Sequence, residues 1–334
     1  MSLPLTILQR EIGKTGVKIS AIGYGGMSLA PGFYGSIDDE SNVSLLKRAL
    51  DIGCNFWDTA DVYGNGHSEK IVSRVLKGRR KDVFLATKFA IDESSGVMKI
   101  NGSPEYLRKA CDASLQRLGT DYIDLYYYHR IDRNTPIEDT VGAMAELVKE
   151  GKVKYLGLSE CSAETLRRAY KVHPITAVEI EYSPWTLDHE KNDLIKTARE
   201  LGVSIVAFAP LGRGFLSGQI KSLDDFEEDD HRRLMPRFQG ENFAKNLELA
   251  DKIKEIAHKK EVTPSQLSLS WVLSQGDDIF VIPGTRKEKY LIENMSAGAV
   301  QLSKEEQAEV RKIAESFEVS GERYNSEMMS VVGH

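Results

Sequence analysis

The sequence contains little cysteine, no excess of basic residues and no long apolar segment. Its 334 residues include three cysteines, none in a CxxC pair: Cys54, Cys111 and Cys161. Three cysteines cannot build a disulfide framework, and they fit a reducing compartment. Asp and Glu number 50 against 44 Lys and Arg, which gives a net charge of −6. Such a mildly acidic chain has no overall electrostatic attraction for nucleic acid, so no nucleic-acid partner is expected, although a local basic patch is not excluded.

Membrane and secretion signals are also missing. Residues 19–37 carry no charge, but five glycines, one proline and several hydroxyl side chains make the segment too polar to span a bilayer. The apolar run near the N-terminus is too short for a signal peptide. We therefore expect a cytoplasmic protein without a membrane partner. The acidic run at 224–230 fits no known metal-binding loop and is expected to be solvated, so no metal site is predicted.

A complete dinucleotide fingerprint is absent as well. Glycines cluster at 23–26 and at 212–214, but neither cluster completes GxGxxG. Neither is promptly followed by a predicted helix, which the fingerprint requires. The sequence therefore argues against a Rossmann dehydrogenase.

What the sequence does contain is a repeat of apolar strand-like runs, each followed by helical segments. Most of the runs are continuously apolar, as a strand buried on both faces of a parallel sheet requires. The eight predicted strands occupy residues 21–25, 55–59, 83–88, 124–129, 153–159, 177–182, 204–210 and 280–285.

The predicted helices have apolar residues at a spacing of three to four. Apolar stripes that stop at a glycine, as helices often do, occupy 43–50, 71–76 and 107–118. Capping-box patterns, which mark helix starts, begin at Thr135, Thr263 and Ser303. Further helices are predicted at 163–172, 191–201, 246–259, 264–275, 287–296 and 304–316.

Eight strand–helix units fit either a closed (β/α)8 barrel or a large open doubly wound sheet. The count of eight, the even spacing and the absence of a linker favour a (β/α)8 TIM barrel that forms one domain over residues 1–334. The spacing breaks once, between strands seven and eight, at a charged segment over 219–246 and an apparent extra helix. In a barrel this insertion leaves the C-terminal face, where active sites lie.

Four residues at the C-terminal ends of neighbouring predicted strands could carry chemistry together: Asp58, Tyr63, Lys88 and His129. Each alone has a structural explanation, such as packing or a lysine that reaches water. Together they form a tuned tyrosine acid, because a neighbouring ammonium lowers the pKa of a phenol from its usual value of about 10. Such a site protonates a carbonyl oxygen as hydride addition builds negative charge there.

These four residues resemble the catalytic tetrad of the aldo-keto reductases. The surrounding strings agree, in order between about residues 8 and 316: NFWDTADVYGNGHSE, VFLATKF, DLYYYHR, YLGLSE, EIEYSPW, APLGRGFLSG and IPGTRKEKYLIEN. The GGM and LGRGFL strings are most similar to the bacterial, plant and fungal branch, some members of which reduce pyridoxal. The resemblance implies an oxidoreductase of the alcohol dehydrogenase type, an N-terminal β-hairpin at about 6–19 that plugs the barrel, and a C-terminal tail over 318–334.

The resemblance also implies a role for each member of the tetrad. Tyr63 would be the general acid, and Lys88 and Asp58 would depress its pKa. His129 would orient the carbonyl group of an aldehyde or ketone substrate.

The implied cofactor is NADPH or NADP+, held without a Rossmann domain. Its nicotinamide would stack on Phe208, with the carboxamide bonded to Ser159, and a glycine-containing loop would wrap the pyrophosphate. Arg286 and Lys287 would pair with the adenosine 2′-phosphate, which suits the planar fork of Arg. The complete set of cofactor-binding candidates is Gly25, Gly26, Met27, Asp58, Ser159, Glu160, Glu179, Phe208, Ala209, Pro210, Leu211, Gly212, Arg213, Gly214, Leu216, Ser217, Gly218, Pro283, Gly284, Thr285, Arg286, Lys287, Tyr290, Glu293 and Asn294.

Three positions depart from what the family often has. Glu160 stands in place of Asn, Glu179 in place of Gln, and Tyr290 where many members have Arg. A carboxylate only accepts hydrogen bonds, whereas Gln also donates. Either the carboxamide is held through its NH2 group alone or Glu179 is partly protonated. Arg286 becomes the main determinant of a preference for NADP.

Two other functions compete with the reductase. The barrel could hold NADP(H) as a redox sensor that docks on a partner, as the channel β-subunits that resemble this family do. Alternatively, Lys88 could form the Schiff base of an aldolase, which leaves Asp58 and Tyr63 unexplained. The sequence favours a small aldehyde or ketone as substrate and a monomer or small homo-oligomer.

Substrate choice is expected to lie in three loops, at 130–135, 213–245 and 318–334. Three aromatic residues suggest an apolar or aromatic pocket: Phe33, Tyr34 and Trp185.

Overall fold

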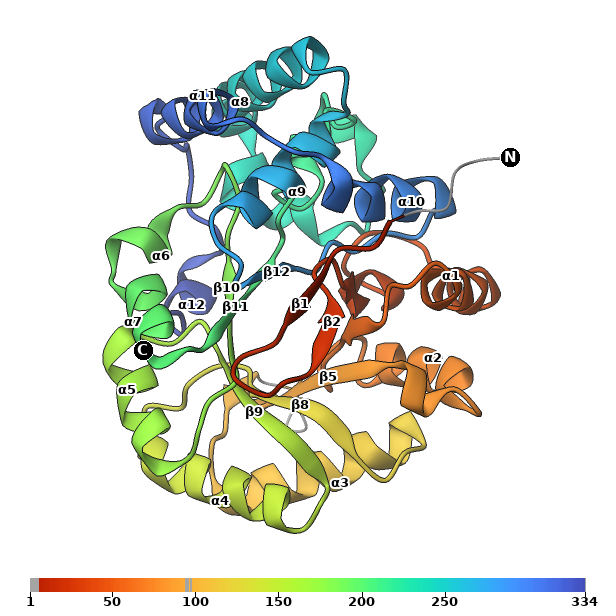
Figure 1. Cartoon of the computed structure of the whole chain (residues 1–334), viewed down its shortest axis with the longest axis vertical. Helices are drawn as coiled ribbons and strands as arrows, with labels where there is room; N and C mark the ends of the chain where they lie inside the picture. Colours follow the sequence, from red (N-terminus) through yellow and green to blue (C-terminus); the bar gives the residue numbers. More distant parts are fainter. Residues whose placement is uncertain (1–5, 94–95, 97, 334) are drawn as a thin grey trace.

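The computed structural model describes residues 6–93, 96 and 98–333, and its centre is a barrel of eight parallel strands (Figure 1). The strands follow one another in the order β3, β4, β5, β8, β9, β10, β11 and β12. A parallel bridge between Ile22 and Val281 joins the two edges. There the amide of Gly23 donates to the carbonyl oxygen of Val281 at 2.8 Å. The ring is thereby closed, and the predicted (β/α)8 barrel is confirmed.

The barrel strands are short and almost entirely buried, as their continuous apolar runs predict. None extends more than one residue beyond its predicted range. They are β3 (Tyr24–Gly25), β4 (Phe56–Asp58), β5 (Phe84–Phe89), β8 (Ile123–Tyr128), β9 (Val153–Ser159), β10 (Ala177–Glu181), β11 (Ser204–Phe208) and β12 (Ile279–Val281). A separate antiparallel pair follows β5 and consists of β6 (Ile91–Asp92) and β7 (Lys99–Ile100).

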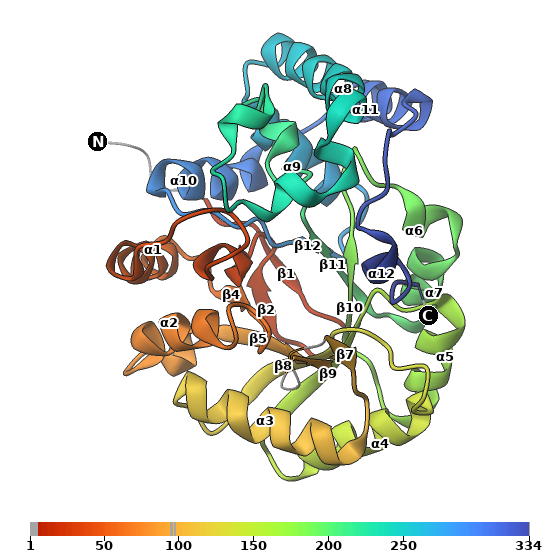
Figure 2. The same ribbon diagram turned by 180° about the vertical axis from the view of Figure 1, so that it is seen from behind.

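Helices surround the barrel and bury apolar residues in a common core with it (Figures 1 and 2). They are α1 (Asp39–Asp51), α2 (His67–Leu76), α3 (Pro104–Leu118), α4 (Ile137–Lys149), α5 (Ala163–Val172), α6 (Asp188–Lys191), α7 (Leu194–Leu201), α8 (Gly240–Lys259), α9 (Pro264–Ser274), α10 (Glu288–Ser296), α11 (Lys304–Ser316) and α12 (Ser326–Met329). In the part of the chain that the structure describes, none of these helices has the length and apolarity needed to cross a membrane.

Two of the three predicted capping boxes are present and one is not. Thr263 and Ser303 each cap a helix reciprocally with the residue three positions on. The box predicted at Thr135 is wrong, because Pro136 occupies the N-cap of α4 and no side chain caps that end. The Thr135 hydroxyl instead donates to Asp132 at 2.9 Å, and this carboxylate also accepts from the amide of Asn134. A competing local acceptor has therefore taken the capping side chain.

The N-terminal hairpin lies across one end of the barrel (Figure 1). Its strands, β1 (Gln9–Glu11) and β2 (Lys18–Ser20), pair antiparallel. Arg10 fixes the hairpin to the barrel, since its guanidinium donates to the carbonyl oxygens of Gly276 and Ile279, both at 2.7 Å. The hairpin closes the end of the barrel that is opposite to the C-terminal ends of the strands.

Two segments cover the other end. The insertion between β11 and β12 begins with short 3-10 turns and continues into α8, which starts six residues earlier than predicted, at Gly240 rather than 246. The tail after α11 returns over the barrel mouth, and both views show α12 beside β10 and α6 (Figures 1 and 2). Backbone contacts hold the tail, including Gly333 N to Glu160 O at 2.8 Å.

Candidate active site

The barrel brings the four predicted catalytic residues together at its C-terminal mouth. Asp58 ends β4 and Lys88 lies near the end of β5, so parallel pairing of these strands places them side by side. Lys88 Nζ donates to an Asp58 carboxylate oxygen, to the Thr59 carbonyl oxygen at 3.0 Å and to Tyr63 Oη at 3.3 Å. The ring of His129, just after β8, lies edge-on to that of Tyr63 with centroids 6.0 Å apart.

The acidity of Tyr63 differs from the sequence-based expectation. Removal from water raises the pKa of Tyr63 above its usual value, and the attraction of Lys88 offsets only part of that rise. Asp58 and a further carboxylate, Glu179, raise it more. The prediction that Lys88 and Asp58 would depress the pKa below that of a free phenol is therefore wrong. The hydroxyl of Tyr63 keeps its proton throughout the physiological range.

Burial and neighbouring charges together set the charges of Lys88 and His129. It acts to lower the pKa of Lys88, but attraction to Asp58, Glu179 and Tyr63 together raises that pKa, so the ammonium stays charged. Burial and the nearby cations lower the pKa of His129 well below its usual value. The imidazole is therefore neutral and presents one N–H donor and one acceptor.

A second carboxylate lies beside the ammonium. Glu179 Oε1 is 3.5 Å from Lys88 Nζ, and the Glu179 side chain is buried. Burial and the proximity of Asp58 raise the pKa of Glu179 to about 8, while Lys88 and Arg130 lower it less. Two carboxylates thus share one ammonium at the end of the barrel.

A cavity of about 640 Å³ opens over this group of residues. Its wall contains Asp58, Tyr63 and His129, while Lys88 lies beneath the wall and is fully buried. The predicted cofactor residues that line it are Gly25, Met27, Asp58, Glu179, Phe208, Ala209, Pro210, Leu211, Arg213, Gly214, Pro283, Gly284, Thr285, Arg286, Lys287 and Tyr290. One continuous cavity therefore runs from the tetrad to the segment that follows β12.

The other predicted cofactor residues do not line the cavity: Gly26, Ser159, Glu160, Gly212, Leu216, Ser217, Gly218, Glu293 and Asn294. Several of them bond to the protein itself. Ser159 Oγ accepts from Arg130 at 3.2 Å, and Glu293 accepts from Thr263 Oγ1 at 2.7 Å. Gly25 has a packing role besides, since a Cβ there would lie 2.5 Å from the Ile282 carbonyl oxygen.

The cavity is suited to a nucleotide with phosphates at one end. Arg286 donates to the backbone carbonyl oxygens of Tyr34 and Ser36, and within the described ranges no carboxylate forms an ion pair with Arg286 or Lys287. Two cations without a carboxylate partner leave positive charge available for a phosphate. Gly214, in the loop after β11, has φ 92°, a conformation that only glycine adopts without strain, so the backbone can approach a ligand closely.

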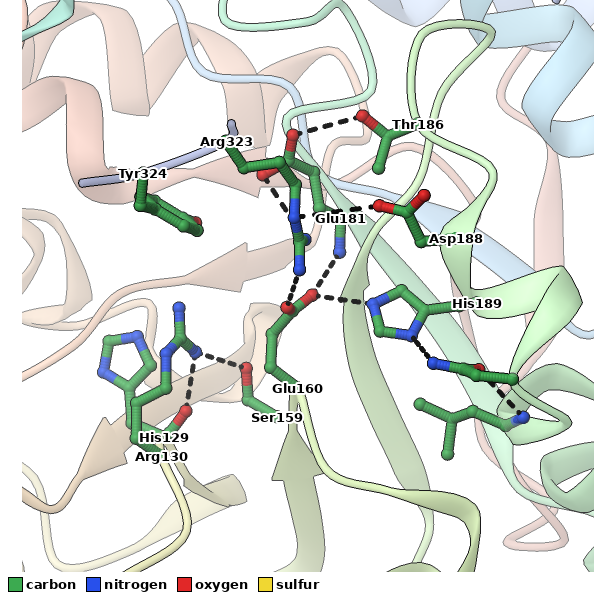
Figure 3. A network of polar contacts seen from close by, with 12 residues as sticks. His129, Arg130, Ser159, Glu160, Glu181, Thr186, Asp188, His189, Arg323 and Tyr324 are labelled. Carbon is green, nitrogen blue, oxygen red and sulfur yellow. Dashed lines mark hydrogen bonds and ion pairs between the residues drawn. The ribbon is translucent and has the colours of Figure 1, made fainter. Parts of the chain in front are cut away.

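Glu160 lies in a second polar network next to the tetrad (Figure 3). Its carboxylate accepts from Arg323 at 2.8 Å, from the backbone amide of Glu181 at 2.8 Å, and contacts His189 Nε2 at 3.1 Å. Burial acts to raise the pKa of Glu160, but His189 and the arginines Arg323 and Arg130 bring it well below the usual value. Both oxygens of this carboxylate are thus engaged by the protein.

The network extends to Glu181, which lies at the end of β10. Arg213 is 3.3 Å from its carboxylate, and Arg237 and Arg323 each lie 3.7 Å from it. Arg213 also donates to the hydroxyl of Tyr324 at 2.9 Å. Figure 3 shows Arg323 between the two glutamates and Tyr324 to one side of them.

The tail contributes residues to the cavity that sequence reasoning did not name individually: Tyr324, Asn325 and Met328. Arg130 also lines the cavity; it begins the predicted substrate loop at 130–135 but was not named as a site residue on its own. The signals in the sequence are indirect, because Arg323 is the one arginine of a tail that also contains three glutamates, and Arg130 simply follows His129. Phe33 and Tyr34 line the cavity as expected, whereas Trp185 does not, because it is buried against Phe215 with ring centroids 4.7 Å apart.

Comparison with known proteins gives consistent results. The sequence model of the Aldo/keto reductase family matches residues 21–315. The chain is 52% identical to the aldo-keto reductase str7 of Strobilurus tenacellus over 94% of both chains. It is 50% identical to the Schizosaccharomyces pombe protein named aldo-keto reductase yakc [NADP(+)], over 96% of this chain and 95% of that protein. A glycerol dehydrogenase from Gluconobacter oxydans has a similar structure, with a TM-score of 0.82, 30% identity and coverage of 92% and 95%.

Proposed function

The chain belongs to the aldo/keto reductase family, and from this premise we propose that it reduces aldehydes or ketones to alcohols with NADPH. The relative named for NADP(+), at 50% identity, supports the choice of cofactor. The observation that carries the proposal is the 3.3 Å contact between Lys88 Nζ and Tyr63 Oη beside a cavity of about 640 Å³. A phenol hydroxyl bonded to a buried ammonium is a proton donor whose anion is stabilised.

When bound, NADPH would supply the hydride for the carbonyl carbon. Arg286 and Lys287 would hold the adenosine 2′-phosphate, since both line the cavity without an ion-pair partner in the part of the chain described. The part of the loop after β11 that lines the cavity, with Gly214, would hold the pyrophosphate, and Phe208 would lie against the nicotinamide ring. Glu179 would accept from the NH2 group of the carboxamide when it is ionised. Glu160 takes no part, because Arg323 and His189 occupy its carboxylate.

Tyr63 and His129 act on the substrate oxygen. The neutral imidazole donates one hydrogen bond to the carbonyl oxygen and orients it. Tyr63 transfers its proton to the same oxygen as negative charge develops there. Lys88 stabilises the resulting phenolate, and Asp58 holds the ammonium in position. The high pKa of Tyr63 is compatible with this role, because a general acid must carry its proton before the hydride arrives.

The substrate occupies the apolar part of the cavity. Phe33 and Tyr34 form one wall, and Tyr324 and Met328 of the tail form another. Aromatic walls favour a flat or apolar carbonyl compound. We therefore place aromatic aldehydes, with pyridoxal among the candidates, ahead of small polar sugars.

A substrate panel tests the proposal. Purified protein is mixed with NADPH and a series of aldehydes and ketones that includes nitrobenzaldehyde and pyridoxal, and the loss of NADPH absorbance is followed. We expect turnover with activated aromatic aldehydes. Tight binding of NADPH without turnover of any carbonyl compound would contradict the reductase and favour a sensor of NADP(H).

A further inference from the structure

The C-terminal end of the barrel contains one more buried carboxyl group than the tetrad requires. Asp58 and Glu179 both face Lys88 Nζ, so two carboxylates share a single ammonium. With both groups ionised, one oxygen of each is buried without a hydrogen-bond partner among the described residues: Asp58 Oδ2 and Glu179 Oε2. Burying an unpaired charge is costly, and a group so placed binds a proton instead. The geometry therefore leaves room for one additional proton.

The neighbours of Glu179 do not remove this imbalance. The groups around it are Asp58 on β4, Lys88 on β5, Tyr127 at the end of β8, Arg130 after that strand, Tyr63 in the loop after β4, and Ser159, paired with it in register on β9. The partner on β11 is the apolar Val206. Arg130 is the one other cation, and within the described chain it forms no ion pair with Glu179; it bonds to Ser159 and the His129 carbonyl oxygen.

Of the two carboxyl groups, Glu179 is the one that holds the proton. Asp58 contacts the ammonium more closely, whereas Glu179 lies 3.5 Å from it. Burial raises the pKa of both groups, but the neighbouring Glu179 carboxyl lowers the pKa of Asp58 whereas Asp58 raises that of Glu179, as expected when the additional proton lies on Glu179. Glu179 also lines the cavity, where water can renew its proton.

We propose that Glu179 is a proton reserve that restores Lys88 and, through it, Tyr63 after each turnover. This inference rests on the proposed reductase function and assigns Glu179 as a positioning residue that acts through Lys88, since its carboxyl group does not contact the hydroxyl of Tyr63 in the structure. The sequence supports the assignment, because a Gln at this position could hold the carboxamide but could not supply a proton.

The proton transfers balance. Tyr63 loses its hydroxyl proton to the substrate oxygen and becomes a phenolate. An N–H bond of Lys88 breaks across the 3.3 Å contact, and its proton re-forms the Tyr63 hydroxyl. The O–H bond of Glu179 then breaks across 3.5 Å, and its proton restores the ammonium. The carboxylate left on Glu179 takes a proton from water in the cavity, so each cycle consumes one proton from solvent.

The test compares the pH dependence of kcat for carbonyl reduction in the wild type, Glu179→Gln and Glu179→Asp. In the wild type we expect kcat to fall as pH rises through about 8, because the reserve empties when Glu179 ionises. Glu179→Gln should lower kcat about tenfold at neutral pH and abolish this fall. Glu179→Asp keeps an acid at the position and should retain part of both the rate and the pH dependence.

Glu69→Gln is the matched control. Glu69 is equally buried, but it lies on α2, accepts from Thr87 at 2.7 Å and is paired with Arg117 outside the cavity. This variant should keep the fall in kcat near pH 8 whatever it does to stability.

Three outcomes would overturn the proposal. They are a flat wild-type profile near pH 8, identical profiles for the wild type and Glu179→Gln, and loss of the pH dependence in Glu69→Gln. The pH profile of the wild type needs no variant, so the proposal can be tested even if a substitution prevents folding. Absence of turnover in every protein would instead reject the reductase function itself.

Discussion

Two clusters of buried carboxyl groups lie within the same barrel mouth, and they differ in how many positive charges accompany those groups. In the first, Asp58 and Glu179 share the ammonium of Lys88, and oxygens of both remain without a partner among the described residues. In the second, Glu160 and Glu181 face three arginines and His189, and Arg323 reaches both glutamates (Figure 3).

The difference between the clusters appears in the acidity of their glutamates. Burial and a like charge raise the pKa of Glu179 to about 8, whereas His189 and the nearby arginines bring that of Glu160 well below its usual value despite burial. The same side chain in the same mouth is therefore protonated in one cluster and ionised in the other. A cluster short of positive charge can exchange protons, and a cluster rich in it fixes a segment of chain.

The largest effect is expected in the first cluster. Tyr63→Phe removes the proposed acid and should lower kcat by about a thousandfold, because no other hydroxyl contacts Lys88 in the described residues. NADPH affinity, measured by fluorescence quenching, should stay within about twofold. Retention of the wild-type kcat would remove Tyr63 from its proposed role.

In the second cluster the expected effects are on the stability of the protein and on KM for the substrate. Arg323→Met leaves Glu160 buried without its arginine and should lower the free energy of unfolding by about 3 kcal/mol. Because Tyr324 adjoins Arg323 and lines the cavity, KM for the substrate should rise more than kcat falls. Denaturant unfolding and steady-state kinetics measure both, and Arg168→Met, which breaks an exposed ion pair with Glu138, is the control. An effect no larger than in this control would show that the tail is held by other contacts.

A cation outside both clusters provides a reference. Arg286→Ala should weaken NADPH binding by about tenfold while changing NADH binding little, since only NADPH carries the 2′-phosphate. Titration with each nucleotide separates the two. Equal weakening of both would assign Arg286 to the rest of the cofactor or to the loop around Tyr34 and Ser36 that it holds.

The smallest effects have opposite signs in the two clusters. The lowered pKa of Glu160 means that its contribution to stability is present above about pH 4 and is lost as pH falls, so Glu160→Gln should destabilise the protein at neutral pH. The raised pKa of Glu179 means that stability is lost as pH rises towards about 8. Glu179→Gln should therefore be more stable than the wild type at pH about 9, by about 1–2 kcal/mol. Thermal unfolding at several pH values measures the change in stability that each variant causes. Changes of the same sign in both variants would contradict the proposed difference between the clusters.

The sequence predicts the first cluster well because its members follow neighbouring strands. Asp58, Lys88 and His129 stand at the ends of apolar runs, and parallel strands bring such ends to one mouth. The acidity of Tyr63 was not predictable, since it depends on how fully the folded mouth excludes water and on the second carboxylate. The charge pattern shows that Lys88 lowers the pKa of Tyr63. It does not show how much burial raises that pKa.

The second cluster could not be predicted because its contacts are distant in sequence. Arg323 lies 163 residues from Glu160, and no periodic pattern in the tail indicates where it returns. The cofactor residues fall between these cases. After β12, residues 283–287 and Tyr290 line the cavity as expected, whereas Glu293 and Asn294 do not, and the carboxylate of Glu160 is engaged by Arg323.

The contrast between the clusters is tested most directly by an NMR titration of carboxyl carbons in protein labelled at glutamate, with Glu179→Gln and Glu160→Gln used to assign the two signals. We predict that the Glu179 signal shifts near pH 8 and that the Glu160 signal stays that of a carboxylate down to about pH 4. Two signals that both remain those of ionised carboxylates between these limits would contradict the account.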